Sequence, residues 1–129
     1  MSGATPQVLV VDDVELMRDL LGMQLGRAGC RVDNAEDGAV ALAALHARPY
    51  DLVLMDRSMP NMDGCAAARA WRAHEQAHGL PAIPIIGVGG QPDDSVDCLA
   101  AGMQEFVTKP LTIAALDALL RRVLNYPPT

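Results

Sequence analysis

The chain has 129 residues, of which 50% are hydrophobic, and it carries a formal net charge of -6 at neutral pH. This size and hydrophobic content predict one domain with a full core. The acidic balance argues against direct binding to nucleic acid or to an anionic membrane, because both favour basic patches. No stretch approaches the roughly 18 apolar residues that span a bilayer, and the first residues lack the pattern of a signal peptide. A cytoplasmic protein is expected.

The first half of the chain alternates short apolar runs with segments of helical period. Residues 7–11 form a continuous, Val-rich run that predicts a buried strand, whereas apolar residues recur at helical spacing over 14–28. Residues 31–34 predict a short strand at or near a sheet edge. Residues 38–47 are rich in Ala and Leu and predict a second helix.

The second half continues the same alternation. In chain order, the pattern predicts a buried strand at 51–55, a helix at 64–78, a strand at 83–88, a helix at 92–101, a strand at 105–108 and a helix that runs to about 124. Asp63 and Thr112 stand before the first and the last of these helices, where their side-chain oxygens can cap the free backbone N–H groups.

Five strand–helix units without a repeat or an internal linker predict a doubly wound parallel sheet with helices on both faces. In such sheets the working site lies beyond the carboxyl ends of the strands. Five residues fall at these ends and predict a single site: Asp12, Asp13, Asp56, Gly89 and Lys109.

The acids among these residues have a chemistry of their own. Asp12 and Asp13 are adjacent and repel each other unless a cation lies between them. Carboxylates without His or Cys suit Mg²⁺ or Mn²⁺ better than zinc. Asp56 can act as a nucleophile that forms an aspartyl phosphate, and Lys109, whose bond to Pro110 is a candidate cis peptide, can neutralise the phosphoryl group. A single Asp after a strand is usually a turn former, but four such groups at matching strand ends favour a site.

Four motifs resemble one family, the receiver domain of two-component response regulators. They are 10–13 (Val-Val-Asp-Asp), 54–64 (from Leu-Met-Asp to Asp-Gly), 84–86 (Pro-Ile-Ile) and 102–110 (from Gly-Met to Lys-Pro). The resemblance covers essentially the whole chain, residues 1–129, as a single receiver domain with a core of about 6–125. It implies an α/β fold, a doubly wound, five-stranded parallel sheet of the flavodoxin-like (βα)5 type with strand order 2-1-3-4-5.

The resemblance also implies a role for each site residue. Asp56 would be the phosphoacceptor and Lys109 would contact the phosphoryl group. Asp13, Asp56 and the backbone carbonyl of Ser58 would bind Mg²⁺ directly, and Asp12 would act through a metal-bound water. The phosphoryl group would come from a histidine kinase or a histidine phosphotransfer protein. The domain would catalyse only its own modification and dephosphorylation, so it would be a signalling domain rather than an enzyme.

Output would pass to a downstream protein through the face formed by the fourth helix, the fifth strand and the fifth helix, from a monomer or a phosphorylation-dependent dimer. At 129 residues, no appended output domain is expected in this sequence. It is therefore expected to be a stand-alone regulator or a receiver from a larger protein, such as a hybrid histidine kinase. The extended segment 71–79 before the fourth strand resembles receivers of hybrid kinases.

One position departs from the family pattern. The family carries a Thr or Ser hydroxyl after the fourth strand, and this chain has Gly89 there. Phe106 occupies the aromatic position that changes rotamer with that hydroxyl. Two interpretations stay open. In the first, Asp56 is phosphorylated, but its coupling to the output face is weakened or rerouted. In the second, the domain is a pseudo-receiver that binds a partner without a phosphorylation switch.

Other functions fit the sequence less well. A phosphatase of the haloacid-dehalogenase type needs Asp-x-Asp after the first strand, and a flavodoxin needs a hydroxyl-rich loop there; this chain has neither. His74 and His78 lie four apart without a third ligand, so a solvated helix face is favoured over a metal site. Trp71 fits a core position or a partner contact equally well. Cys30, Cys65 and Cys98 form no CxxC pair, and buried, reduced thiols are expected.

Overall fold

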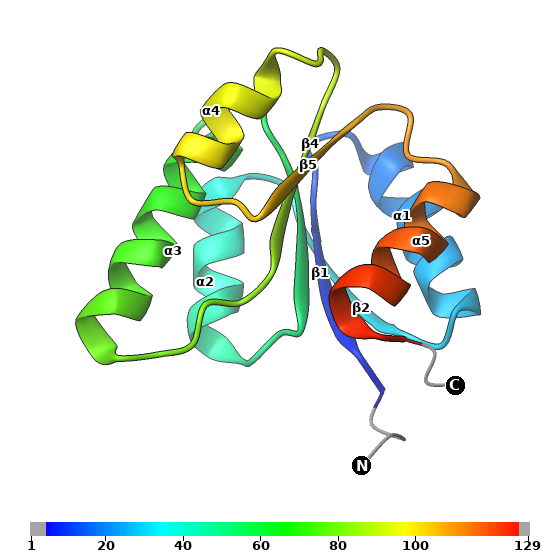
Figure 1. The fold of residues 1–129 in the computed structure, drawn as a ribbon, viewed down its shortest axis with the longest axis horizontal. Helices are drawn as coiled ribbons and strands as arrows, with labels where there is room; N and C mark the ends of the chain where they lie inside the picture. Colours follow the sequence, from blue (N-terminus) through cyan, green and yellow to red (C-terminus); the bar gives the residue numbers. More distant parts are fainter. Residues whose placement is uncertain (1–4, 127–129) are drawn as a thin grey trace.

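The computed structural model describes residues 5–126 and contains five parallel strands and five helices (Figure 1). The strands are β1 (Gln7–Val11), β2 (Arg31–Ala35), β3 (Leu52–Asp56), β4 (Ile85–Gly89) and β5 (Glu105–Thr108), and the helices are α1 (Glu15–Arg27), α2 (Gly38–Ala47), α3 (Gly64–His78), α4 (Asp94–Ala100) and α5 (Ile113–Leu124). The strand order is β2-β1-β3-β4-β5. The predicted fold class and strand order are therefore confirmed.

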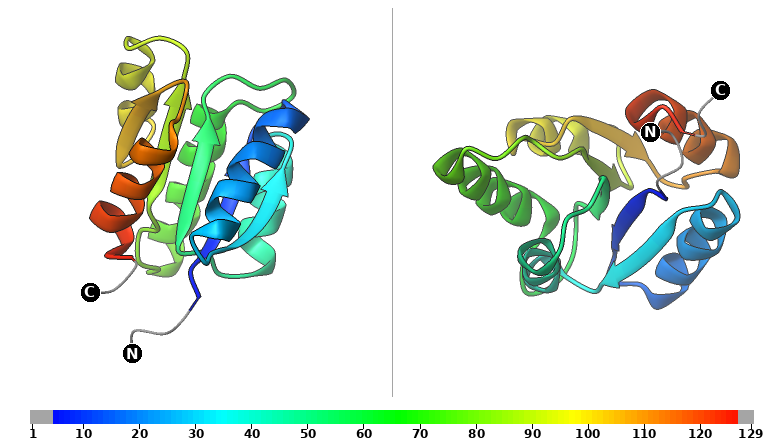
Figure 2. Two further views of the ribbon diagram at one scale, coloured as in Figure 1. Left: turned by 90° about the vertical axis from the view of Figure 1, so that its right-hand side faces the viewer. Right: turned by 90° about the horizontal axis from the view of Figure 1, so that it is seen from below.

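Helices cover both faces of the sheet, with α1 and α5 on one side and α2, α3 and α4 on the other (Figure 2). The alternation of side chains along each strand builds the two layers. On β1, Val8 and Val10 pack with α1 and α5, whereas Leu9 and Val11 pack with the three other helices. Because both faces are buried, the central strands are continuously apolar, which is why they could be recognised as short runs.

Most predicted boundaries hold to within a residue, and two differ by more. The strand predicted at 83–88 begins at Ile85, because the N–H of Ile83 donates to Glu75 Oε2 (2.9 Å) instead of a neighbouring strand, and Pro84 has no N–H. The helix predicted at 92–101 begins at Asp94. The backbone hydrogen bonds just before this helix join positions three apart, as from the Ser95 N–H to the Pro92 carbonyl (3.2 Å). This spacing is typical of a turn.

The predicted helix caps are confirmed. Asp63 accepts a hydrogen bond from the N–H of Ala66 (2.8 Å), and Thr112 accepts one from Ala115 (3.1 Å). All three cysteines are free and buried, as predicted. Among residues 5–126, no helix is both long enough and apolar enough to cross a membrane.

Candidate functional site

The carboxyl ends of the strands meet at one end of the molecule, at the top of Figure 1. Asp12 and Asp13 follow β1, Asp56 is the last residue of β3, and Lys109 follows β5. Gly89 ends β4, next to β3 in the sheet. Parallel pairing therefore brings together residues that are up to 97 positions apart in the sequence, as the strand pattern predicted.

Three carboxylates and one amine form a compact cluster. Asp12, Asp13 and Asp56 each offer an oxygen, and these oxygens all lie within 4.8 Å of one another. Asp12 and Asp56 are only 3% and 4% exposed, whereas Asp13 is exposed. Lys109 Nζ lies 3.1 Å from Asp56 Oδ2 and 3.8 Å from Asp12 Oδ2. The peptide between Lys109 and Pro110 is cis, as the sequence suggested.

Backbone N–H groups hold the two buried acids in place. Asp12 Oδ1 accepts from the N–H of Val14 (2.9 Å), and Asp56 Oδ1 accepts more weakly from the N–H of Ser58 (3.2 Å). The carbonyl of Asp12 also accepts from the Arg18 guanidinium (2.8 Å). Each buried carboxylate thus has one oxygen bound to its own loop and the other directed toward Lys109.

The charges of this cluster do not balance. Burial raises the pKa of Asp56 and the charge of Asp12 adds to the effect, although the hydrogen bonds and charge of Lys109 and the Ser58 N–H oppose it. Burial alone would lower the pKa of Lys109, but the bond to Asp56 and the surrounding carboxylates raise it. Three acids against one amine leave an excess of negative charge. An all-oxygen donor set with that excess fits a hard divalent cation.

Gly89 has its neighbours packed tightly against it. A Cβ added to Gly89 would lie 2.7 Å from Asp94 Oδ2 and 2.9 Å from two ring atoms of Phe106. The Phe106 ring is half-buried and packs on the core beneath α4. The space into which a hydroxyl-bearing side chain would project is therefore filled by a carboxylate and an aromatic ring.

Arg57, Asp94 and Asp97 were not predicted as members of this region. Arg57 Nε lies 3.5 Å from Asp94 Oδ1, and its terminal nitrogen pairs with Asp97. The only sequence signal was the pair of acids three apart at the start of a predicted helix, directly after the glycine-rich loop. Nothing local indicated that the side chain after Asp56 would reach them.

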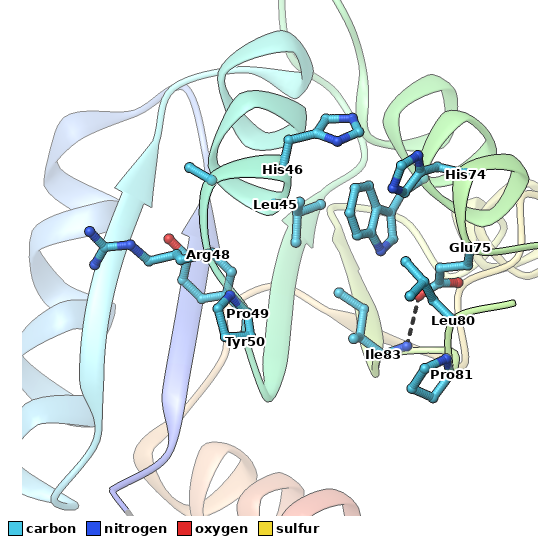
Figure 3. Close-up of a pocket in the computed structure, with 12 residues that line it drawn as sticks. Leu45, His46, Arg48, Pro49, Tyr50, His74, Glu75, Leu80, Pro81 and Ile83 are labelled. Atoms are coloured by element: carbon cyan, nitrogen blue, oxygen red, sulfur yellow. Dashed lines mark hydrogen bonds between the residues drawn. The ribbon is translucent and has the colours of Figure 1, made fainter. Parts of the chain in front are cut away.

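A hollow of about 410 Å³ lies between α2, α3 and the segment before β4 (Figure 3). Trp71, which the sequence left undecided, is 7% exposed and belongs to the core. His74 is half-buried, stacked on Trp71 with ring centroids 4.8 Å apart and edge-on to His46 at 4.5 Å, so the expected solvated face holds only for exposed His78. Within residues 5–126, only the aspartate cluster places ligand atoms of three His, Cys, Asp or Glu side chains all within 4.8 Å of one another.

Comparisons with known proteins agree with this geometry. The family described as "Response regulator receiver domain" matches residues 8–121. The chain is 34% identical to the hybrid signal transduction histidine kinase L of Dictyostelium discoideum over 90% of its own length, and 35% identical to the transcriptional regulatory protein PhoP of Escherichia coli K12 over 95%. It spans only 7% and 58% of these two relatives.

A solved structure shows the same likeness over the whole domain. The receiver domain of the sensor histidine kinase PA1611 from Pseudomonas aeruginosa PAO1, solved with a magnesium ion coordinated in its active-site cleft, is 31% identical and superposes with a TM-score of 0.84. The match covers 95% of this chain and 99% of that one. The chain therefore belongs to the response regulator receiver domain family, the phosphoacceptor domains of two-component phosphorelay signalling.

Proposed function

We propose that Asp56 is the phosphoacceptor of this receiver domain. The observation that carries the proposal is the position of its carboxylate, which is buried at the end of β3, 3.1 Å from the Lys109 amine and next to two further acids. A carboxylate oxygen of Asp56 attacks the phosphorus of a phosphohistidine. The new O–P bond forms as the P–N bond breaks, and the imidazole nitrogen keeps the bonding electrons and takes up a proton.

The cluster of acids also supplies a binding site for a divalent cation. Asp13, Asp56 and the backbone carbonyl of Ser58 would bind Mg²⁺ directly, and Asp12 would bind through a water; Mn²⁺ has the same preference for oxygen ligands. When bound, the cation neutralises charge on the acids and on the incoming phosphoryl group. This neutralisation matters because burial disfavours the ionised form of Asp56, which is the form that attacks.

Lys109 provides the second positive charge. Its Nζ already bonds to Asp56 Oδ2, so a phosphoryl group added to that carboxylate would lie within reach of the same amine. Transfer of a phosphoryl group depends mainly on positioning and on charge stabilisation. Lys109 therefore stabilises the phosphoryl group during its arrival and its hydrolysis, the only two reactions that we assign to the domain.

The partners follow from the relatives and from the exposed surface. Similarity to a hybrid histidine kinase favours a histidine kinase or histidine phosphotransfer domain as the phosphoryl donor. We place this transfer in the cytoplasm. Val96 and Leu99 on α4 are 69% and 50% exposed, which suits docking of a downstream protein or a second copy on the α4-β5-α5 face. The domain works either alone or as part of a longer kinase.

Labelling with a small phosphodonor tests the proposal. With Mg²⁺ and acetyl phosphate, wild-type protein is expected to gain one phosphoryl group per chain by intact mass, and Asp56→Asn to gain none. Asp63→Asn is the matched control, because Asp63 lies in the same loop but caps α3 outside the cluster. Removal of Mg²⁺ by chelation should abolish labelling of the wild type.

One observation favours the pseudo-receiver as a second candidate. Gly89 removes the hydroxyl that the family uses to register the phosphoryl group, and Asp94 and Phe106 fill its place. Absence of labelling under the conditions above would support that candidate and overturn our proposal. Turnover of a free phosphate ester, rather than of acetyl phosphate, by catalytic amounts of protein would instead indicate a phosphatase.

A further inference from the structure

Arg57 connects the proposed phosphoacceptor strand to helix α4. It follows Asp56 directly, and its backbone N–H donates to the carbonyl of Val88 on β4 (2.9 Å). Its guanidinium pairs with Asp97 and approaches Asp94, both in the first turn of α4. The Nε–H group is buried and makes no hydrogen bond to any residue of the described part of the chain. Arg57 therefore has an unused donor between β3 and α4.

Asp94 joins this connection to the glycine loop. Its Oδ1 lies 3.5 Å from Arg57 Nε, while its Oδ2 accepts from the N–H of Gln91 (3.2 Å) and lies 2.7 Å from the position of a Cβ on Gly89. Gly89 ends the strand beside Asp56, since Asp56 pairs with Val88 in the sheet. The Asp94 carboxylate thus occupies the space in which a side chain at position 89 would face the phosphoryl group.

We infer that Arg57 takes the place of the missing hydroxyl as the group that responds to phosphorylation. When Asp56 is phosphorylated, Arg57 releases its partners on α4 and binds the phosphoryl group. This inference rests on the proposed phosphorylation of Asp56. A phosphoryl group adds negative charge and three acceptor oxygens, and a guanidinium binds such a group through two parallel donors. The same charge repels the carboxylate of Asp94. Both effects draw Arg57 away from Asp94 and Asp97, and the first turn of α4 loses its tie to β3.

The exchange makes a specific prediction for helix α4. The test is hydrogen exchange of peptides that cover 90–101. It compares the free protein with the protein in the presence of Mg²⁺ and beryllofluoride, which mimics the phosphoryl group. In the wild type, the mimic should speed exchange about three- to fivefold, as expected for the loss of two partly exposed ion pairs. In Arg57→Gln, exchange should already be at that faster level and the mimic should add nothing. Labelling of Asp56 by acetyl phosphate should persist in Arg57→Gln.

Two further variants separate this role from simple support of α4. Arg48→Gln removes another arginine–aspartate pair, with Asp33 at 3.3 Å, and should behave as wild type. Arg57→Lys keeps the charge but lacks the paired donors, so it should restore the slow exchange and only part of the response. If Arg57 only supports α4, the mimic will still speed exchange further in Arg57→Gln, and the inference is overturned. An unchanged α4 in labelled wild type also overturns it, whereas absence of labelling overturns the proposed function as well.

Discussion

Substitution of Gly89 by Ala is expected to destabilise the domain by about 1 kcal/mol. The backbone of Gly89 is not in the left-handed region, so the smaller entropy of an unfolded alanine chain would by itself stabilise the fold by about 0.4–1 kcal/mol. Against this gain, the new Cβ would lie 2.7 Å from Asp94 Oδ2 and 2.9 Å from the Phe106 ring. Overpacking of this kind costs about 1–3 kcal/mol, and a cost near the middle of that range, reduced by the entropic gain, leaves a net loss of about 1 kcal/mol.

Urea unfolding, followed by the fluorescence of the single tryptophan, measures this change. The matched control is Gly26→Ala in the last turn of α1, where no atom lies within 4 Å of the added Cβ. That variant should gain about 0.5–1 kcal/mol, because glycine is unfavourable inside a helix. If Gly89→Ala gains as much as Gly26→Ala, the crowding argument fails, and a hydroxyl at this position would fit without moving Asp94 or Phe106.

Three further predictions concern the fold. Thr112→Ala removes the cap on the Ala115 N–H and should lower the free energy of unfolding by about 1 kcal/mol in urea, whereas Thr112→Ser should not. Burial and the hydrogen bond to Asp33 raise the pKa of Tyr50 to about 12, so ultraviolet titration should show one tyrosine that ionises near this pH. Because this folded pKa exceeds the unfolded value of about 10, the contribution of Tyr50 to stability is complete below pH ~10 and is lost as the pH rises toward 12. Tyr50→Phe should not show this loss of stability. Burial likewise raises the pKa of Cys98 to about 12, so a thiol reagent at pH 8 should label this residue only on unfolding, and rapid labelling of the folded protein would refute its burial.

The fold could be predicted from the sequence because the short apolar runs of the strands and the helical spacing of apolar residues occupy separate segments. The central strands β1, β3 and β4 are buried on both faces and appear as short apolar runs, while caps such as Asp63 and Thr112 mark where helices begin. The carboxyl ends of parallel strands share one edge of the sheet. The grouping of Asp12, Asp56 and Lys109 was therefore predictable although their side chains come from three separate strands.

What could not be predicted depends on side-chain direction and on contacts between helices. Arg57 reaches α4 because of how the chain leaves β3, and no local pattern encodes that direction. His74 is half-buried because α2 places His46 beside it, 28 positions earlier in the chain. The start of β4 moved because the buried Glu75 carboxylate captures a backbone N–H that a strand would otherwise use.

Phosphotransfer from a phosphohistidine donor protein, with the modified residue mapped by mass spectrometry, tests the central claim most directly. The account predicts Mg²⁺-dependent incorporation of one phosphoryl group per chain, located on Asp56, and faster loss of that group from wild type than from Lys109→Gln. Incorporation at another residue, or persistence of labelling in Asp56→Asn, would contradict the account.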